Sequence, residues 1–391
     1  MEKALEIVLI GAGFYVCGGK KKDYGTVLPG ILTFAKLNQI KTNIIVAINN
    51  KESAKIFSKK LTALEKILFT EQLINHEFIF CEGSPEIFLK EYKSKNKLIA
   101  GIISIPDHLH FKWANSLLNA KIPLLVVKPL TLKMNQSLEL YKLSKSLSTP
   151  LFVEFHKRYD RQLRYTRDSF LKGLIGEPLY CFTEYTQKKE VPEDNFKNWA
   201  GMTNIFSYLG VHYVDAVRYI TNSTPLRVCA VGQKSFLYKK QINTFDSIQC
   251  NIEWQTKDKQ IFNQVILSSW VESNKATSMS KQDFHLIGTN GRIDCEQKER
   301  GIKVLTDKNP TEDINPDFTR MYSLNNSNIF EGYGIDSINN FISYIVEDKF
   351  SETDNRMCTV KESLYSTAVI EAAYHSLNKN SDWIEILSSQ F

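Results

Sequence analysis

A lysine and a histidine stand at positions where they could move protons. Lys128 ends an apolar, strand-like run and precedes Pro129. His212 lies three residues before Asp215 in an expected helix, so His212 and Asp215 share one helical face. Histidine titrates nearest neutrality, and a lysine inside a pocket loses its proton more readily than in water. His212 and Lys128 could therefore take the proton of a substrate hydroxyl, while Asp215 orients the ring or binds substrate.

Each of these residues also has a purely structural interpretation. A lysine before proline is commonly a solvated loop residue, and a lone helical histidine commonly packs in the core or at the surface. Asp215 could pair with Arg218. Tyr208, one turn before His212, could relay a proton, bind a substrate hydroxyl, or only pack against aromatic neighbours.

A glycine-rich turn follows the first expected strand, Glu6–Ile10. Gly11 and Gly13 occupy the first two glycine positions of the dinucleotide-binding pattern G-x-G-x-x-G, and Val16 occupies the third. The first glycine allows a tight turn and the second lets the backbone approach a pyrophosphate. Because the glycine-rich turn follows the first strand directly, it predicts a dinucleotide site that includes Phe14 and Tyr15. A turn of this kind also occurs in ordinary connections from a strand to a loop.

Two basic or neutral segments bear on the choice of cofactor. The loop after the glycines contains three lysines, Lys20–Lys22, which are either solvated or close to a cofactor phosphate. The second expected strand ends at Asn49 and Lys51, where an acidic residue would bind the adenosine ribose and repel a 2′-phosphate. This favours NADP, or the use of both NAD and NADP.

The elements that would hold these residues fall into two patterns. Up to residue 155, short apolar strands alternate with amphipathic helices, which predicts an α/β, doubly wound parallel sheet of the Rossmann type in residues 1–155. We expect its strands and helices at Glu6–Ile10, Val27–Leu37, Asn43–Ile48, Lys97–Ile105, Pro123–Val127, Leu138–Ser146 and, as the last strand, Leu151–Phe155.

From residue 156 the apolar residues alternate by twos, as in Ser247–Trp254, which predicts a C-terminal α+β domain with a mostly antiparallel open sheet in residues 156–391. We expect a turn at Gly288–Gly291 and helices at Tyr208–Tyr219, Ile335–Glu347 and Lys361–Leu377.

Composition excludes several classes of protein. The chain has 391 residues and a net charge of +6 that is too dilute to indicate nucleic acid or a membrane as partner. Its seven cysteines are scattered, which is typical of a reducing compartment and of a metal-free protein. No secretory signal or apolar stretch of about 20 residues is visible, so we expect a cytoplasmic protein.

The motifs, taken in order, resemble the glucose–fructose oxidoreductase, inositol dehydrogenase and rhizopine catabolism (Gfo/Idh/MocA) family. The segments that carry the resemblance are Ile102–His110, Val126–Leu130, Phe155–Tyr159, Gly210–Asp215, Gly288–Gly291 and Glu371–Tyr374. It implies an NAD(P)-dependent oxidoreductase that transfers hydride to or from a hydroxyl or keto group of a sugar, cyclitol or nucleotide-sugar. It also implies a homodimer or homotetramer that pairs through the C-terminal sheet.

The resemblance assigns roles residue by residue. Lys128 and His212 match the family's lysine and helix histidine, whereas Pro106, His110 and Pro129 match the nicotinamide pocket. We expect substrate contacts from Tyr208, Asp215, Arg158 and Trp199. Val127 replaces the usual glutamate before the lysine, and Tyr208 stands where many relatives carry aspartate. The alternatives are a non-catalytic dinucleotide- or sugar-binding regulator and an NAD-dependent glycoside hydrolase on the same fold.

Overall fold

The chain forms two compact units in the computed structural model, which describes residues 4–19, 23–94, 98–298, 300–324, 327–349 and 354–387. The first unit contains Met1–Leu130, Asn135–Tyr159 and Asp317–Val360, and the second contains Thr131–Met134, Asp160–Pro316 and Lys361–Phe391. Lys20, Lys21 and Lys22 lie outside the described residues, so their predicted approach to a cofactor phosphate stays a prediction.

The first unit is built on a largely parallel sheet, as predicted. Its strand order is β17-β6-β5-β4-β1-β2-β3, and β17 pairs antiparallel with β6. Every residue of β1 is buried, as expected for a central strand covered on both faces. The bounds are β1 (Leu5–Ile10), β2 (Thr42–Ile48), β3 (Ile74–Phe80), β4 (Leu98–Ile103), β5 (Leu124–Val127), β6 (Leu151–Glu154) and β17 (Cys358–Thr359).

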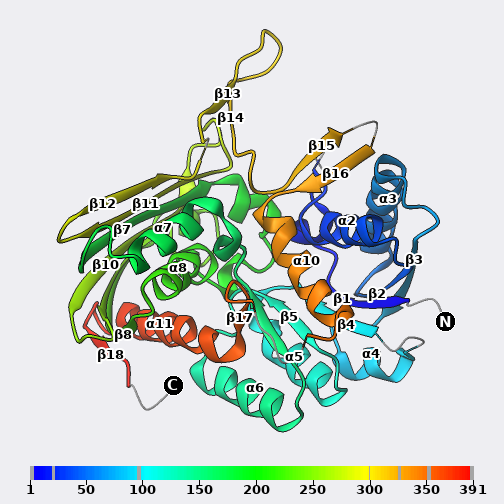
Figure 1. The fold of residues 1–391 in the computed structure, drawn as a ribbon, viewed down its shortest axis with the longest axis horizontal. Helices are drawn as coiled ribbons and strands as arrows, with labels where there is room; N and C mark the ends of the chain where they lie inside the picture. Colours follow the sequence, from blue (N-terminus) through cyan, green and yellow to red (C-terminus); the bar gives the residue numbers. More distant parts are fainter. Residues whose placement is uncertain are drawn as a thin grey trace. The chain divides into compact units, whose positions relative to one another are not determined.

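Helices cover this sheet, and one of them comes from late in the sequence. The helices are α1 (Phe14–Cys17), α2 (Val27–Asn38), α3 (Lys51–Leu68), α4 (Pro85–Glu91), α5 (His110–Asn119), α6 (Met134–Ser146) and α10 (Tyr333–Val346). Helix α10 lies beside α2 (Figure 1), and Gly30 of α2 packs closely against Ile338 of α10. A Cβ added to Gly30 would lie only 3.0 Å from the Cβ of Ile338. The hairpin β15 (Arg320–Leu324) and β16 (Ser327–Glu331) belongs to the same unit.

The second unit is built on a mostly antiparallel sheet, which confirms the predicted fold class. Its order is β12-β11-β7-β10-β9-β8-β18, and β7 and β10 pair in parallel. In β9 the predicted alternation places Ile248, Cys250, Ile252 and Trp254 in the core. The bounds are β7 (Pro178–Lys188), β8 (Thr224–Gln233), β9 (Ser247–Gln255), β10 (Ile261–Glu272), β11 (Ser280–Gly288), β12 (Gly291–Glu296) and β18 (Ile384–Glu385).

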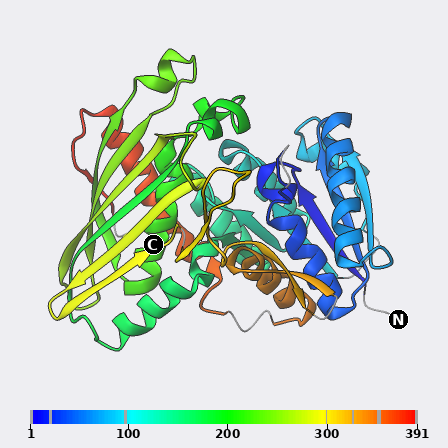
Figure 2. The same ribbon diagram turned by 90° about the horizontal axis from the view of Figure 1, so that it is seen from above.

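The helices of the second unit lie against one face of this sheet, whose strands form a single layer in Figure 2. They are α7 (Arg161–Leu171), α8 (Val211–Thr221) and α11 (Val360–Asn378). The short α9 (Phe236–Lys239) lies in the connection between β8 and β9. Two π-helical turns, η3 (Val191–Asn195) and η5 (Phe206–Gly210), and a 3₁₀ turn, η4 (Ala200–Met202), precede α8. A smaller hairpin pairs β13 (Ile302–Val304) with β14 (Glu312–Ile314).

Most predicted elements are present, with several differences. Helices α3, α5 and α7 were not predicted, and residues 69–91, where the sequence shows no clear pattern, hold β3 and α4. The strand predicted to be last, β6, is followed in the sheet by β17. The units also do not follow a single boundary at residue 155, because residues 317–360 pack with the first unit. In the described part of the chain, no helix combines the length and apolarity needed to cross a membrane.

Candidate functional site

The glycine-rich turn lies at the carboxyl edge of the parallel sheet. Strands β1, β4 and β5 are neighbours, so Gly11, Ser104 and Lys128 follow strands that end at the same edge. Gly11 has a φ of 101°, and a Cβ on it would lie 2.3 Å from the Ser104 carbonyl oxygen. A Cβ on Gly13 would meet no described atom within 4 Å. The turn therefore needs glycine at Gly11 for its own shape, and at Gly13 it leaves open space for a ligand.

The two aromatic residues after Gly13 differ in direction. Phe14 is exposed, as a cofactor contact would be. The Tyr15 hydroxyl instead donates to Glu154 Oε1 at 3.0 Å and lies 3.1 Å from His156 Nδ1. Burial and the nearby Glu154 carboxylate raise the pKa of Tyr15 well above its ordinary value. The side-chain hydroxyl of Tyr15 is thus directed into the protein.

The residues after β2 have two different roles. Asn50 and Ser53 form the cap of α3, whereas Asn49 and Lys51 are exposed and could contact a ligand. Asn50 caps α3, because its side chain accepts a hydrogen bond from the Ser53 backbone N–H at 2.8 Å. Asn49 and Lys51 are exposed. These two predicted cofactor residues can therefore face a ligand at the carboxyl end of β2.

Lys128 is buried directly after β5, with 7% of its surface exposed. Burial lowers the pKa of Lys128 to about 8, although the negative charges of Asp107 and Glu154 act in the opposite direction. A lysine with this pKa exchanges its proton in the neutral to mildly alkaline range, as a proton-transfer group requires.

His110 connects the ends of two neighbouring strands. It is buried, with Nδ1 2.7 Å from the Pro129 carbonyl oxygen and Nε2 2.9 Å from the Ile105 carbonyl oxygen. Both ring nitrogens therefore face the backbone, next to Pro106 on one side and to Lys128 on the other. His110 positions these segments. Arg158 is buried in η2 (His156–Tyr159) of the same unit.

The histidine motif lies in the second unit. His212 and Asp215 are both in α8, with exposed fractions of 2% and 1%. Arg218 forms its ion pair with Glu362, at 3.1 Å, and also bonds the carbonyl oxygens that follow α8. The structural alternative in which Arg218 neutralises Asp215 is therefore not favoured.

Tyr208 lies in the π-helical turn before α8 and belongs to an aromatic cluster. Its ring centroid is 5.0 Å from that of Phe196, 6.0 Å from Trp199 and 5.7 Å from Trp270. The cluster holds Tyr208 and Trp199 next to each other, and both side chains remain partly exposed. The packing interpretation of Tyr208 is thus supported by its three aromatic neighbours, and its side chain also remains partly exposed.

Sequence reasoning missed several polar residues around Lys128. Asp107 and Glu154 are buried and act on it electrostatically, and Ser337 reaches Glu154 from α10. Asp107 lies in the segment Ile102–His110, which carries the family resemblance, but the sequence does not show that Asp107 is buried. Ser337 gave no signal, because nothing in the sequence shows that α10 packs on the first unit. Among the described residues, no cluster of three or more His, Cys, Asp or Glu side chains could hold a metal ion.

Comparison with known proteins places the chain among oxidoreductases. A family model described as "Oxidoreductase family, C-terminal alpha/beta domain" (Gfo/Idh/MocA) matches residues 169–386, which is more than half of the chain. Myo-inositol 2-dehydrogenase of Thermotoga maritima is 24% identical over 56% of this chain and 64% of its own length. The uncharacterized oxidoreductase YdgJ of Escherichia coli is 28% identical over 29% and 33%. The chain thus matches between about a third and two thirds of the length of these relatives.

Solved structures agree in fold. Scyllo-inositol dehydrogenase from Lactobacillus casei, with bound NAD(H) and scyllo-inositol, has a TM-score of 0.68 at 14% identity and covers 98% of this chain and 99% of its own. Myo-inositol 2-dehydrogenase from Lactobacillus plantarum has a TM-score of 0.68 at 15% identity and covers 98% and 100%. From the matched family model and the two-part fold, this chain belongs to the Gfo/Idh/MocA family of oxidoreductases.

Proposed function

We propose that this protein is an NAD(P)-dependent dehydrogenase or reductase that acts on a hydroxyl or keto group of a sugar, cyclitol or nucleotide-sugar. The observation that carries the proposal is Lys128, a buried lysine with a pKa of about 8 at the carboxyl edge of a parallel sheet. The glycine turn that begins at Gly11 follows a strand of the same edge. The inositol dehydrogenases among the similar proteins support a polyhydroxylated substrate.

The residues present fit a dinucleotide. The open space at Gly13 would admit the pyrophosphate to the backbone, and the exposed Asn49 and Lys51 would meet the adenosine ribose. With no carboxylate at Asn49 or Lys51, we propose NADP as the better substrate of the two cofactors. When bound, the nicotinamide accepts or donates the hydride.

The protein's own part in this chemistry is to handle the proton. In the oxidative direction the substrate carbinol carbon loses a hydride, and its hydroxyl proton passes to His212 as general base, with Lys128 sharing the hydrogen bond to the oxygen. In the reductive direction the same groups return the proton to the developing alkoxide. We propose that Tyr208, Asp215, Arg158 and Trp199 bind the other hydroxyls of the substrate.

A turnover assay tests this function. Purified protein is mixed with NAD or NADP and a panel of cyclitols, sugars and nucleotide-sugars, and the nicotinamide absorbance is followed. We expect at least one substrate to be turned over, and His212→Ala to lower kcat by about a hundredfold or more without loss of folding. Unchanged absorbance with every substrate contradicts the proposal, and glycosidic cleavage without net NADH formation would indicate a hydrolase.

A further inference from the structure

A buried carboxylate, that of Glu154, lies at the end of β6, where no sequence motif predicts a functional group. Glu154 is 2% exposed, and its Oε1 accepts hydrogen bonds from the Ser337 hydroxyl at 2.7 Å and the Tyr15 hydroxyl at 3.0 Å. His156 Nδ1 lies 3.3 Å from the same oxygen. Oε2 receives no hydrogen bond from any residue that the structure describes.

Glu154 is also in register with the residue before Lys128. In the parallel pair of β5 and β6, Val127 is the partner of Glu154, and register partners in a sheet lie side by side on the same face. Val127 is the position at which the sequence resemblance leads one to expect a glutamate before the lysine. The carboxylate missing from β5 is therefore present one strand away.

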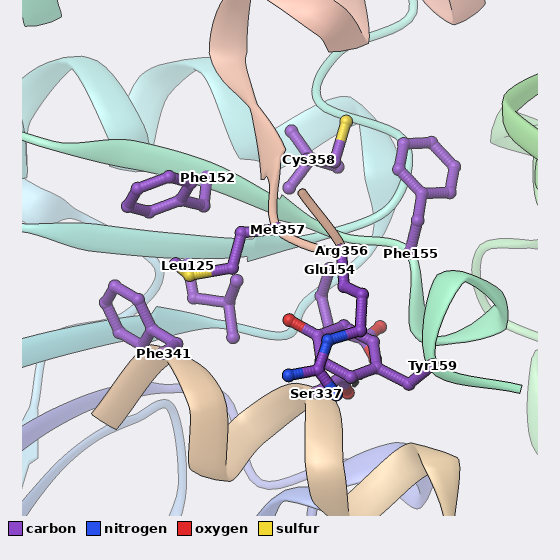
Figure 3. A pocket seen from close by; sticks show the side chains of 11 residues that line it. Leu125, Phe152, Glu154, Phe155, Tyr159, Ser337, Phe341, Arg356, Met357 and Cys358 are labelled. Atoms are coloured by element: carbon purple, nitrogen blue, oxygen red, sulfur yellow. Dashed lines mark hydrogen bonds between the residues drawn. The ribbon is translucent and has the colours of Figure 1, made fainter. Parts of the chain in front are cut away.

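An ionised carboxylate with one oxygen unbonded is costly to bury unless a cation compensates it. Glu154 lines a small cavity with Ser337, Tyr159 and Arg356 on its polar side, as Figure 3 shows. Arg356 is already paired with Asp354, with Nε 2.8 Å from Oδ2. Lys128 is a cation on which two negative charges act, that of Asp107 and that of Glu154.

We propose that Glu154 is a positioning residue for Lys128 and supplies, from β6, the negative charge that the chain lacks at Val127. Its hydrogen bonds from Tyr15 in α1 and Ser337 in α10 fix the carboxylate relative to the glycine turn. The charge keeps a larger fraction of Lys128 in the ammonium form at neutral pH than burial alone would allow. The inference rests on the proposed role of Lys128 in proton transfer.

The direct test is the pKa of Lys128, read without substrate or cofactor. The full-length protein is labelled with lysine carrying ¹³C at Cε and titrated by NMR, and the Lys128 signal is identified by its absence from Lys128→Met. We expect Glu154→Gln, which keeps an oxygen for Tyr15 and Ser337, to lower the pKa of Lys128 by about one pH unit. Val127→Glu/Glu154→Gln, which returns a carboxylate to the paired position, should raise it again.

Two controls separate charge from packing. Ser337→Ala removes a hydrogen bond to Glu154 but no charge, so the Lys128 titration should stay at the wild-type value. If Glu154→Gln does not fold, Tyr15→Phe/Glu154→Met removes donor and acceptor together, which is commonly close to neutral for stability. The Ser337 hydroxyl keeps the Gly334 carbonyl oxygen, 2.9 Å away, as an acceptor.

The outcomes distinguish this inference from the proposed function. An unchanged Lys128 pKa in the neutral Glu154 variants overturns the inference, and so does failure of both variants to fold, because Glu154 would then serve the fold alone. A lowered pKa in an enzyme that turns over no substrate would retain the coupling and reject the proposed function. A lowered pKa together with turnover supports both.

Discussion

Asn49 and Asn50 are adjacent and both exposed at the end of β2. Asn50 caps α3 through Ser53, whereas the Asn49 side chain forms no hydrogen bond with another residue that the structure describes. Neighbouring residues of the same type can therefore be separated into one that holds the fold and one that is placed to read the cofactor.

Exchanging these asparagines tests the proposed preference for NADP. Asn49→Asp should shift the ratio of kcat/KM for NADP and NAD toward NAD by about tenfold or more, because a carboxylate binds the ribose hydroxyls and repels a 2′-phosphate. Asn50→Asp is the matched control, since aspartate caps a helix as well as asparagine does. An equal shift in both variants, or a wild-type protein that strongly prefers NAD, contradicts the proposal.

For single residues, the sequence predicted which side chains belong to the candidate site but not what surrounds each of them in the fold. Lys128, His110 and the glycines follow strand ends, and strand ends can be read from apolar runs. The task of His110, which holds two backbone carbonyls, and the charge of Glu154 beside Val127 depend on register and on burial. Neither is encoded in a local pattern.

Among the elements, the turn between β1 and α1 holds two glycines with different reasons to be glycine. Gly11 has a positive φ and lies against the Ser104 carbonyl, whereas Gly13 has φ of −82° and open space around it. Only the first is required by the fold.

Alanine at each position separates folding from binding. Gly11→Ala should lower the free energy of unfolding by about 1–3 kcal/mol or more, because the backbone strain adds to a clash. Gly13→Ala should leave the thermal midpoint close to wild type but weaken dinucleotide binding by about tenfold or more, since its Cβ fills the space that a pyrophosphate would use. Thermal unfolding and calorimetric titration with NADP measure the two effects. Wild-type affinity in a folded Gly13→Ala protein would exclude this turn as the cofactor site.

Elements with strong periodicity were predicted well, and the failures have physical causes. Strand β9 was recognised because its apolar residues alternate by twos. The unpredicted pairing of β17 with β6 joins segments about 200 residues apart in the sequence. The π-helical turn before α8 departs from the α-helical period that places Tyr208 one turn before His212.

For the whole molecule, the outer face of the second unit's sheet is the surface that we propose for self-association. Tyr180 and Phe182 of β7 are 52% and 38% exposed, and Val265, the register partner of Phe182 in β10, lies beside them. Large exposed apolar side chains gathered on one sheet face are typical of an interface.

Charge placed on this face should change the oligomeric state. We expect the wild-type protein to be a dimer or tetramer by light scattering and Phe182→Glu to shift it toward a monomer, because an unpaired buried charge is costly. Tyr374→Glu, at a comparably exposed aromatic residue of α11, should leave the mass unchanged. A monomeric wild-type protein, or a Phe182→Glu variant with wild-type mass, would show that this face does not mediate assembly.

The division of the chain into units is the feature that the sequence predicted least completely. Residue 155 lies close to Tyr159, where the first unit's second segment ends, because the pattern of strands changes there. The return of residues 317–360 to the first unit depends on the packing of α10 against α2, which joins Gly30 to Ile338. Long-range packing of this kind leaves no local signature.

The central claim is that Lys128 takes part in proton transfer, and the pH dependence of hydride transfer in single turnovers tests it most directly. In the wild-type holoenzyme, the rate of substrate oxidation should rise with pH through an inflection near 8, because Lys128 that has lost its proton can share the hydroxyl proton with the general base His212. Lys128→Arg, which stays charged, should react about a hundredfold or more slowly and lack this inflection. If Lys128→Arg transfers hydride at the wild-type rate and with the same inflection, Lys128 takes no part in proton transfer and the account is contradicted.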